Sequence, residues 1–199
     1  MREIVVTEKV DGTNSAVIIE EVDPELDYEY EGGFTLATVE RGGKTYAVAA
    51  QSRNRLIFPS KATDNHGFAA FVQQNAEELF ILLGPGRHFG EWWGKGINKR
   101  YASAMEGIKG FALFNVAKHA DLHHWLRFGD QQVLVEPVHV LYEGPFSEQK
   151  IRDTLNELKK HGSWMSPFDP AEGIVVFHTQ SRQTYKITLD QNDAGKWEA

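Results

Sequence analysis

The chain has 199 residues, no cysteine, a hydrophobic content of 41% and a formal net charge of −7. The missing cysteines exclude disulfides, thiolate metal sites and cysteine nucleophiles, and they fit a reducing, cytoplasmic interior. No apolar run reaches the roughly 18 residues of a membrane span. The negative charge counts against a general nucleic-acid binder with a basic surface, but it leaves room for a local basic groove.

Most of the chain predicts short β-strands, because β-branched and aromatic residues alternate with polar ones between turn residues. The expected strands span residues 3–6, 15–20, 34–39, 45–50, 87–92, 109–116, 133–135, 138–141, 172–177 and 184–189. Arg41-Gly42-Gly43-Lys44 is typical of a hairpin turn. Residues 20–31 are acidic, contain a proline and predict a solvated loop.

Two segments have the periodicity of helices. The first follows the N-cap candidates Asp64 and Asn65 and runs as one helix to Gly84. The second begins after Ser147 and ends at Gly162. Two helices among many strands predict the α+β class, with mostly antiparallel sheets and flanking helices. Because no linker or repeat divides the sequence, we expect a single domain over residues 1–199.

Four charged residues lie at or near the ends of predicted strands. Lys9 lies in a polar turn at the start of a strand, Glu91 ends a strand, Glu172 begins one, and Lys186 lies in the last one. Two carboxylates and two lysines suit a nucleoside triphosphate with Mg²⁺. A lysine attacks as the free amine, which burial or a neighbouring cation favours. Lys9 is therefore the candidate nucleophile, although by itself it would more simply be an exposed turn lysine.

Six short motifs resemble those of the covalent nucleotidyltransferases, which include the polynucleotide ligases and the mRNA capping enzymes. In chain order they are Lys9-Val10-Asp11-Gly12-Thr13-Asn14 (motif I), Gln51-Ser52-Arg53-Asn54 (Ia), Phe89-Gly90-Glu91-Trp92 (III), Phe111-Ala112-Leu113-Phe114-Asn115-Val116 (IIIa), Glu172-Gly173-Ile174-Val175-Val176 (IV) and Tyr185-Lys186-Ile187 (V). The ordered set is far more specific than the first motif alone. The form of motif III and the Asn that ends motif I resemble the RNA ligases more than the DNA ligases or capping enzymes.

The resemblance implies the nucleotidyltransferase fold of ligase adenylation domains and the activity of an ATP-dependent RNA ligase of the RNA ligase 2-like type. In that reaction Lys9 attacks the α-phosphate of ATP and forms lysyl-AMP. The AMP passes to a 5′-phosphate end, and a 3′-hydroxyl then displaces it. The implied partners are nicked or single-stranded RNA ends, as in RNA repair, with DNA ends left open and no membrane.

The resemblance also implies a role for each motif residue. The expected catalytic residues are Lys9, Glu172 and Lys186. Mg²⁺ is expected at Glu172 and Glu91. The expected ATP contacts are the main chain at Glu8, Asn14 and Glu91 near the ribose, Arg53 at the ribose or a phosphate, Phe114 stacked on adenine, and Lys186 at the α-phosphate.

Two departures from the family pattern leave alternatives open. Motif V usually holds two lysines, and here only Lys186 is present. We also expect no appended C-terminal domain, which ligases and capping enzymes usually carry. One alternative is a stand-alone nucleotidyltransferase that loads AMP or GMP and needs a partner to bind nucleic acid. Another is a non-catalytic nucleotide- or RNA-binding module of the same fold.

Several aromatic and basic residues have a structural and a functional interpretation. Phe111 replaces Phe114 as the stacking ring if the strand register shifts by one residue. Trp92 and Trp93 could stack on a nucleotide, but at least one is expected in the core. The best basic patch comprises Lys95, Lys99, Arg100 and Tyr101, and the most metal-like cluster comprises His119, Asp121, His123 and His124.

Overall fold

The computed structural model describes residues 3–23, 35–97, 108–167 and 169–189. The chain divides into two compact units. Unit 1 comprises residues 1–11, 98–106 and 138–199, and unit 2 comprises residues 12–97 and 107–137. Each unit has its own sheet and its own hydrophobic core. No helix among the described residues is long and apolar enough to cross a membrane.

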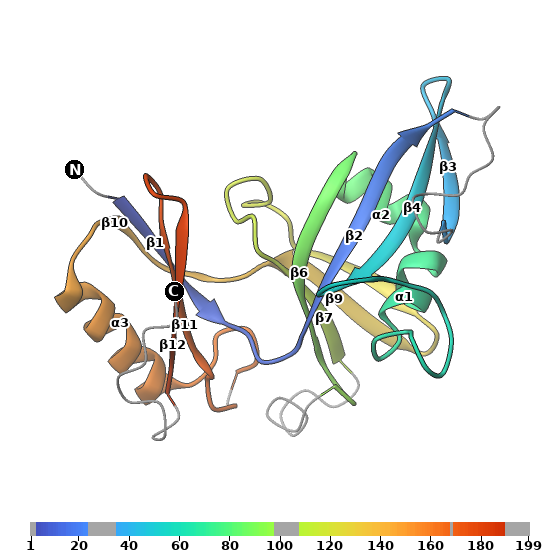
Figure 1. Ribbon diagram of the computed structural model, residues 1–199. Helices are drawn as coiled ribbons and strands as arrows, with labels where there is room; N and C mark the ends of the chain where they lie inside the picture. Colours follow the sequence, from blue (N-terminus) through green and yellow to red (C-terminus); the bar gives the residue numbers. More distant parts are fainter. Residues whose placement is uncertain (1–2, 24–34, 98–107, 168, 190–199) are drawn as a thin grey trace. The chain divides into compact units, whose positions relative to one another are not determined.

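Unit 1 contains a four-stranded antiparallel sheet in the order β10-β1-β11-β12 (Figure 1). Its elements are β1 (Glu3–Lys9), β10 (Val140–Pro145), α3 (Glu148–His161), β11 (Gly173–His178) and β12 (Gln183–Thr188). Alternate residues of β1 are buried, so that Ile4 and Val6 join Ile151 and Leu158 of α3 in one core. Lys9 therefore lies on the opposite face of this sheet, away from the helix.

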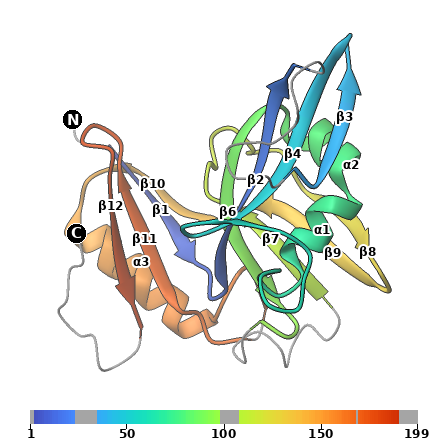
Figure 2. The ribbon, with the colours of Figure 1, turned by 45° about the vertical axis from the view of Figure 1, so that its right-hand side comes forward.

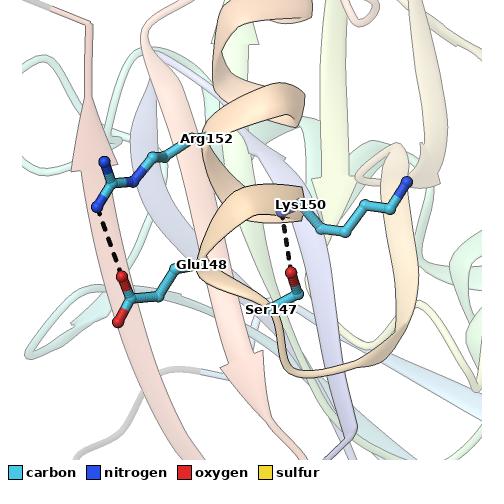
Figure 3. Close-up of polar contacts among 4 residues, drawn as sticks. All are labelled: Ser147, Glu148, Lys150 and Arg152. Atoms are coloured by element: carbon cyan, nitrogen blue, oxygen red, sulfur yellow. Dashed lines mark hydrogen bonds and ion pairs between the residues drawn. The ribbon is translucent and has the colours of Figure 1, made fainter.

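Helix α3 confirms the second predicted helix and its ends. The Ser147 hydroxyl accepts a hydrogen bond of 3.3 Å from the Lys150 amide, and Glu148 pairs with Arg152 one turn later (Figure 3). Gly162 ends the helix with a φ of 82°. The pair between Glu148 and Arg152 is exposed, so it stabilises the helix only slightly.

Unit 2 contains an eight-stranded sheet in the order β3-β4-β2-β6-β7-β9-β8, with β5 paired to β4. Its elements are β2 (Thr13–Val22), β3 (Ala37–Arg41), β4 (Lys44–Ser52), β5 (Leu56–Ile57), α1 (Phe68–Gln74), α2 (Ala76–Leu83), β6 (Gly86–Gly94), β7 (Ile108–Leu113), β8 (His124–Phe128) and β9 (Gln131–Pro137). Helices α1 and α2 lie against one face of the sheet (Figure 2). Val17, Trp92 and Phe111 pack there beneath Phe68 and Phe71.

The pairing confirms the α+β class with mostly antiparallel strands. Among the described strands, β7 and β9 form the one parallel pair. The predicted hairpin turn joins β3 to β4, and Gly42 and Gly43 have φ angles of 59° and 73°. These angles belong to the left-handed region that such a two-residue turn requires.

The structure corrects three local predictions. The first predicted helix is two helices, because Asn75 has a φ of −113° and its side chain caps the carbonyl of Phe71. Its N-cap is Gly67 rather than Asp64 or Asn65, although Asp64 Oδ1 accepts from the Ala70 amide at 3.0 Å. Strands β5 and β8 were not predicted.

Lys9 and the acidic stretch also differ from expectation. Lys9 is the last residue of β1 and does not lie in the turn that follows. Residues 20–22 continue β2, so the expected acidic loop begins later. Residues 24–34, which hold most of that loop, are outside the described part of the chain.

Candidate functional site

The end of β1 places Lys9 in direct contact with Glu172. Lys9 Nζ donates a hydrogen bond to Glu172 Oε1, although 163 residues separate them in the chain. The side chains are 21% and 18% exposed, so the pair is partly shielded from water. The second oxygen, Glu172 Oε2, is buried and has no hydrogen-bond partner among the described residues. An acceptor oxygen without a donor is a suitable ligand for a cation.

Close strand packing fixes the position of this pair. Lys9 is opposite Gly173 in the antiparallel register of β1 and β11. A Cβ atom at Gly173 would lie 2.0 Å from the carbonyl oxygen of Ile187 on β12. The Leu189 amide donates to the Glu172 carbonyl at 2.9 Å. Glycine at position 173 thus lets β12 lie close to β11, and Glu172 is held beside Lys9.

Lys186 lies on the same face of the unit 1 sheet as Lys9. Thr7 of β1 is opposite Val175 of β11, and Val175 is opposite Lys186 of β12. Directly opposite residues of antiparallel strands point to the same face. Lys186 is exposed, so its ammonium group can meet an anion on that face.

Glu8 points to the opposite face and has a structural environment. It is 1% exposed; Ser163 Oγ donates to Oε1, and the Trp164 and Met165 amides donate to Oε2 at 2.8 and 3.2 Å. Burial raises the pKa of Glu8, and these three hydrogen bonds oppose the increase. The Glu8 amide donates to the His139 carbonyl at 3.0 Å. Its carboxylate and amide therefore fasten β1 to residues 139 and 163–165.

A second group of predicted residues lies on one face of the unit 2 sheet. Asn14 of β2 is directly opposite Glu91 of β6, which is opposite Ala112 of β7. A Cβ atom at Gly12 would lie 2.4 Å from the Trp92 carbonyl oxygen and 2.9 Å from Glu91 Cγ. The glycine of motif I therefore lets the chain pass directly over the strand that carries Glu91. This row faces away from α1 and α2, since Trp92 and Phe111 point toward them.

Phe114 continues this face beside Phe89. The Phe114 amide donates to the Phe89 carbonyl at 2.9 Å, one step beyond the paired residues of β7. Both rings are 43% exposed, whereas Phe111 is fully buried and its ring centroid lies 5.0 Å from that of Phe68. Of the two phenylalanines considered for stacking, Phe114 is the accessible one.

The other motif and basic residues fall into three environments. Arg53 is exposed in the turn after β4, where the Ser52 amide donates to the Arg55 carbonyl at 2.9 Å. Trp92 and Trp93 are fully buried. Lys95 is exposed, whereas Lys99, Arg100 and Tyr101 lie outside the described residues.

The residues of the histidine cluster do not come together as a metal site. His124 begins strand β8, and His123 Nδ1 lies 2.9 Å from Glu136 Oε2. His119 instead faces His88, with 3.4 Å between His119 Nε2 and His88 Nδ1. Within the described ranges no three His, Asp or Glu side chains are grouped to hold a metal ion.

The structure thus gathers the predicted residues in two groups. Lys9 and Lys186 share a face of the unit 1 sheet, and Lys9 contacts Glu172 just before β11. Asn14, Glu91 and Phe114 share a face of the unit 2 sheet. The sequence predicted no individual role for Phe89 and only a helix N-cap for Asn65. The alternation of Phe89 with Glu91 across Gly90 could have indicated that Phe89 lies on the same face as Glu91. No pattern in the sequence indicates the contacts of Asn65, because their partners lie about 50 residues away.

A comparison with protein families supports the family resemblance of the sequence. The family model described as RNA ligase matches residues 2–196, which is nearly the whole chain. No curated protein sequence matches the chain significantly. On the strength of the family match, the chain belongs to the RNA ligase family.

Proposed function

We propose that the protein is an ATP-dependent RNA ligase that carries AMP on Lys9 and has the nucleotidyltransferase fold of ligase adenylation domains. The observation that carries the proposal is the contact between Lys9 and Glu172, two motif residues from opposite ends of the chain. Their motifs occur in a chain that belongs to the RNA ligase family.

In the first step the Lys9 amine attacks the α-phosphorus of ATP. An N–P bond forms, the bond from the α-phosphorus to the bridging oxygen breaks, and pyrophosphate leaves. Lys9 Nζ must first lose a proton, and Glu172 Oε1 is the acceptor that it already contacts. Lys186 on the same sheet face offsets negative charge that develops on the α-phosphate.

In the following steps the AMP moves to the RNA. A 5′-phosphate oxygen attacks the phosphorus of lysyl-AMP and releases Lys9, and the 3′-hydroxyl of the other RNA end then displaces AMP. Asn14, Arg53 and Glu91 would contact the ribose or phosphates, and Phe114 would stack on the adenine. The main chain at Glu8 would contact the adenine edge through groups other than its amide N–H, which already donates to His139.

The residues present fit a magnesium ion. Glu172 Oε2 is a buried carboxylate oxygen without a partner among the described residues. Mg²⁺ in proteins often takes one or two carboxylates together with substrate phosphates, so a cluster of three acids is not required. Glu172 would hold it through this oxygen, and the ion would supply positive charge to the phosphates.

Covalent labelling tests the proposal directly. The protein is incubated with α-labelled ATP and Mg²⁺ and then separated under denaturing conditions. We expect label on the wild-type chain and none on Lys9→Ala, because only Lys9 provides the attacking nitrogen. Glu172→Gln and Lys186→Ala should each reduce labelling at least tenfold, because each removes one charged group from the reacting centre. The control is Lys44→Ala, which removes an exposed lysine that is paired 2.7 Å from Glu21. Labelling of Lys9→Ala at the wild-type level would refute the mechanism.

A second candidate function shares the first step only. The described residues contain no complete basic surface for RNA, since three members of the expected patch lie outside them. A nucleotidyltransferase that depends on a partner would label Lys9 but would not seal nicked or single-stranded RNA by itself. A sealing assay with end-labelled RNA therefore separates the two functions, and α-labelled GTP tests the choice of nucleotide.

A further inference from the structure

A polar hollow lies in unit 2 beside the turn that carries Arg53. Its volume is about 520 Å³. The residues that line it come from one continuous stretch: Ser52, Arg55, Ile57, Ser60, Lys61, Ala62, Thr63, Asp64, Asn65, His66 and Gly67. No motif of the family resemblance includes the lining beyond Ser52, and the function proposed above leaves this hollow without a role.

The backbone at one side of the hollow is suited to an anion. Asn65, His66 and Gly67 have successive φ angles of 51°, 58° and 88°. Their amide N–H groups have no acceptor among the described residues, whereas the neighbouring amides of Asp64 and Phe68 donate to Ser60 and Asn65 carbonyls. Residues 65–67 form a turn, and successive N–H groups in a turn can form a concave anion-binding surface. The segment is held firmly, because Trp92 Nε1 donates to the His66 carbonyl at 3.2 Å.

The side chains of the hollow add positive charge. Arg55 and Lys61 are exposed, and neither forms an ion pair with a described residue. The one carboxylate in the lining, Asp64, accepts a hydrogen bond from the Ala70 amide at 3.0 Å, so one of its oxygens is engaged with α1. Burial also raises the pKa of Asp64. Among the described residues, the hollow therefore combines two unpaired cations with unused backbone donors.

Its position connects it to the nucleotide residues of unit 2. The Ser52 hydroxyl donates to the Arg55 carbonyl at 3.2 Å, which closes the turn that holds Arg53. Asn65 Nδ2 donates to Ser15 Oγ at 2.8 Å, and Asn65 Oδ1 accepts from Thr13 Oγ1 at 3.0 Å. The wall of the hollow is thus joined to β2 on both sides of Asn14.

We propose that this hollow binds a phosphate group of the RNA strand. The proposal rests on the function proposed above, which supplies RNA as the ligand, and it adds a place where the chain grips that RNA. Arg55 and Lys61 would meet the phosphate oxygens from the open side. The amides of residues 65–67 would donate from the other side.

The test measures RNA binding without ATP or Mg²⁺, so that it does not depend on catalysis. Fluorescence anisotropy follows a labelled single-stranded RNA of about twelve nucleotides, at several salt concentrations. The pocket variant is Arg55→Ala/Lys61→Ala, and a second variant, Ala62→Glu, adds a negative charge while leaving both cations in place. The matched control is Lys150→Ala/Arg152→Ala on α3, which removes the same net charge from an exposed helix face (Figure 3). Circular dichroism checks that every variant is folded.

We expect both pocket variants to bind roughly tenfold more weakly than the wild type and the α3 control to bind within about twofold of it. The salt dependence of log K should become shallower by roughly 0.7 for each phosphate that the variant no longer neutralises. If the pocket and control variants were weakened equally, the effect would come from net charge alone, and the proposal would be overturned. Unchanged RNA binding in the pocket variants would also overturn it.

Two further RNA ligands identify the phosphate and separate the proposals. Weaker binding seen only with 5′-phosphorylated RNA assigns the hollow to the terminal phosphate, and weaker binding seen equally with 5′-hydroxyl RNA assigns it to an internal phosphodiester. Failure of the proposed function appears instead as wild-type protein that takes no label from ATP. That result is independent of whether the pocket and control variants bind RNA differently.

Discussion

Glu8 and Lys9 are adjacent in the chain, but their side chains lie on opposite faces of the sheet and have different partners. Because successive residues of a strand point to opposite faces, the Glu8 carboxylate enters the helix-covered side and binds residues 163–165, while Lys9 meets Glu172 on the other side. The buried Glu8 holds the end of β1 in place, so that the backbone of Lys9 is fixed in position. A shift of β1 by one residue would exchange these two environments and place Lys9 in the core.

Two histidines of unit 2, His88 and His119, should make the stability of the protein depend on pH. His88 is 3% exposed; its Nε2 lies 2.8 Å from the Gly84 carbonyl oxygen, and its Nδ1 lies 3.4 Å from His119 Nε2. A carbonyl only accepts, so Nε2 carries the proton and Nδ1 of neutral His88 is the acceptor. Burial lowers the pKa of His88 to about 4 and also lowers the pKa of His119.

We predict that the protein loses stability as the pH falls below about 6.5. The ordinary pKa of His88 is 6.5, so the unfolded chain takes up a proton there before the folded chain does. The folded state keeps its full stability above pH 6.5 and loses it progressively toward pH 4, by about 2 kcal/mol at pH 5 from His88 alone. Urea unfolding at about pH 7.5 and about pH 5 measures the difference. His88→Gln should reduce it, and His124→Gln, at an exposed position of β8, should not.

At the scale of elements, the ladder of β6 and β7 separates a packing face from an accessible one. Phe111 points into the core beneath α1, and Phe114 lies on the other face beside Phe89. The two phenylalanines belong to one short segment, so they form a natural pair for separating stability from nucleotide binding.

We predict that Phe111→Ala lowers stability, whereas Phe114→Ala weakens the use of ATP with little effect on stability. Phe111→Ala removes a fully buried ring and should lower the free energy of unfolding by about 3–5 kcal/mol. Phe114→Ala removes a ring that is 43% exposed and should change stability little, while it raises the ATP concentration needed for half-maximal labelling severalfold. Denaturant unfolding and ATP titration of labelling measure the two quantities. Unchanged ATP dependence in Phe114→Ala would remove this residue from the nucleotide site.

Elements with strong local signals could be predicted from the sequence. The hairpin at Gly42-Gly43 and the ends of α3 depend on turn and cap residues that act within a few positions. The break at Asn75 was missed, because the apolar spacing continues through it and only its backbone departs from the helix. Strand β8 was missed because two histidines precede its single buried residue, Leu126, and alternation is weak there.

The candidate site, too, could be predicted only in part from the sequence. The motif residues and their order could be found in the sequence, but the sheet face of each depends on the register of strands distant in the chain. Nothing near Glu8 indicated that its carboxylate is bound by the amides of residues 164 and 165. The hydrogen bonds of Asn65 to Thr13 and Ser15, about 50 residues away, could not be predicted from the sequence either.

At the scale of the whole molecule, each unit is stabilised by its own core. The core of unit 1 includes Leu158 of α3 and Ile174 of β11, and that of unit 2 includes Phe71 of α1 and Trp92 of β6. A cavity made in one core should therefore weaken chiefly the sheet that it supports.

We predict that Leu158→Ala and Phe71→Ala have complementary effects on backbone protection. Each removes a side chain that is at most 2% exposed and should cost about 2–5 kcal/mol locally. Hydrogen exchange followed by mass spectrometry should show faster exchange in β1 and β11 for Leu158→Ala, and faster exchange in β2 and β6 for Phe71→Ala. Faster exchange throughout the chain in either variant would mean that the two units unfold together.

The pairing of β1 also determines when Lys9 can meet its carboxylate partner during synthesis. Lys9 leaves the ribosome well before residue 172, yet its strand pairs with β10 and β11, and its carboxylate partner is Glu172. The strands of unit 2 lie between and can pair earlier. A nascent chain stopped anywhere before residue 172 therefore carries Lys9 without Glu172, and such a fragment should be unable to consume ATP.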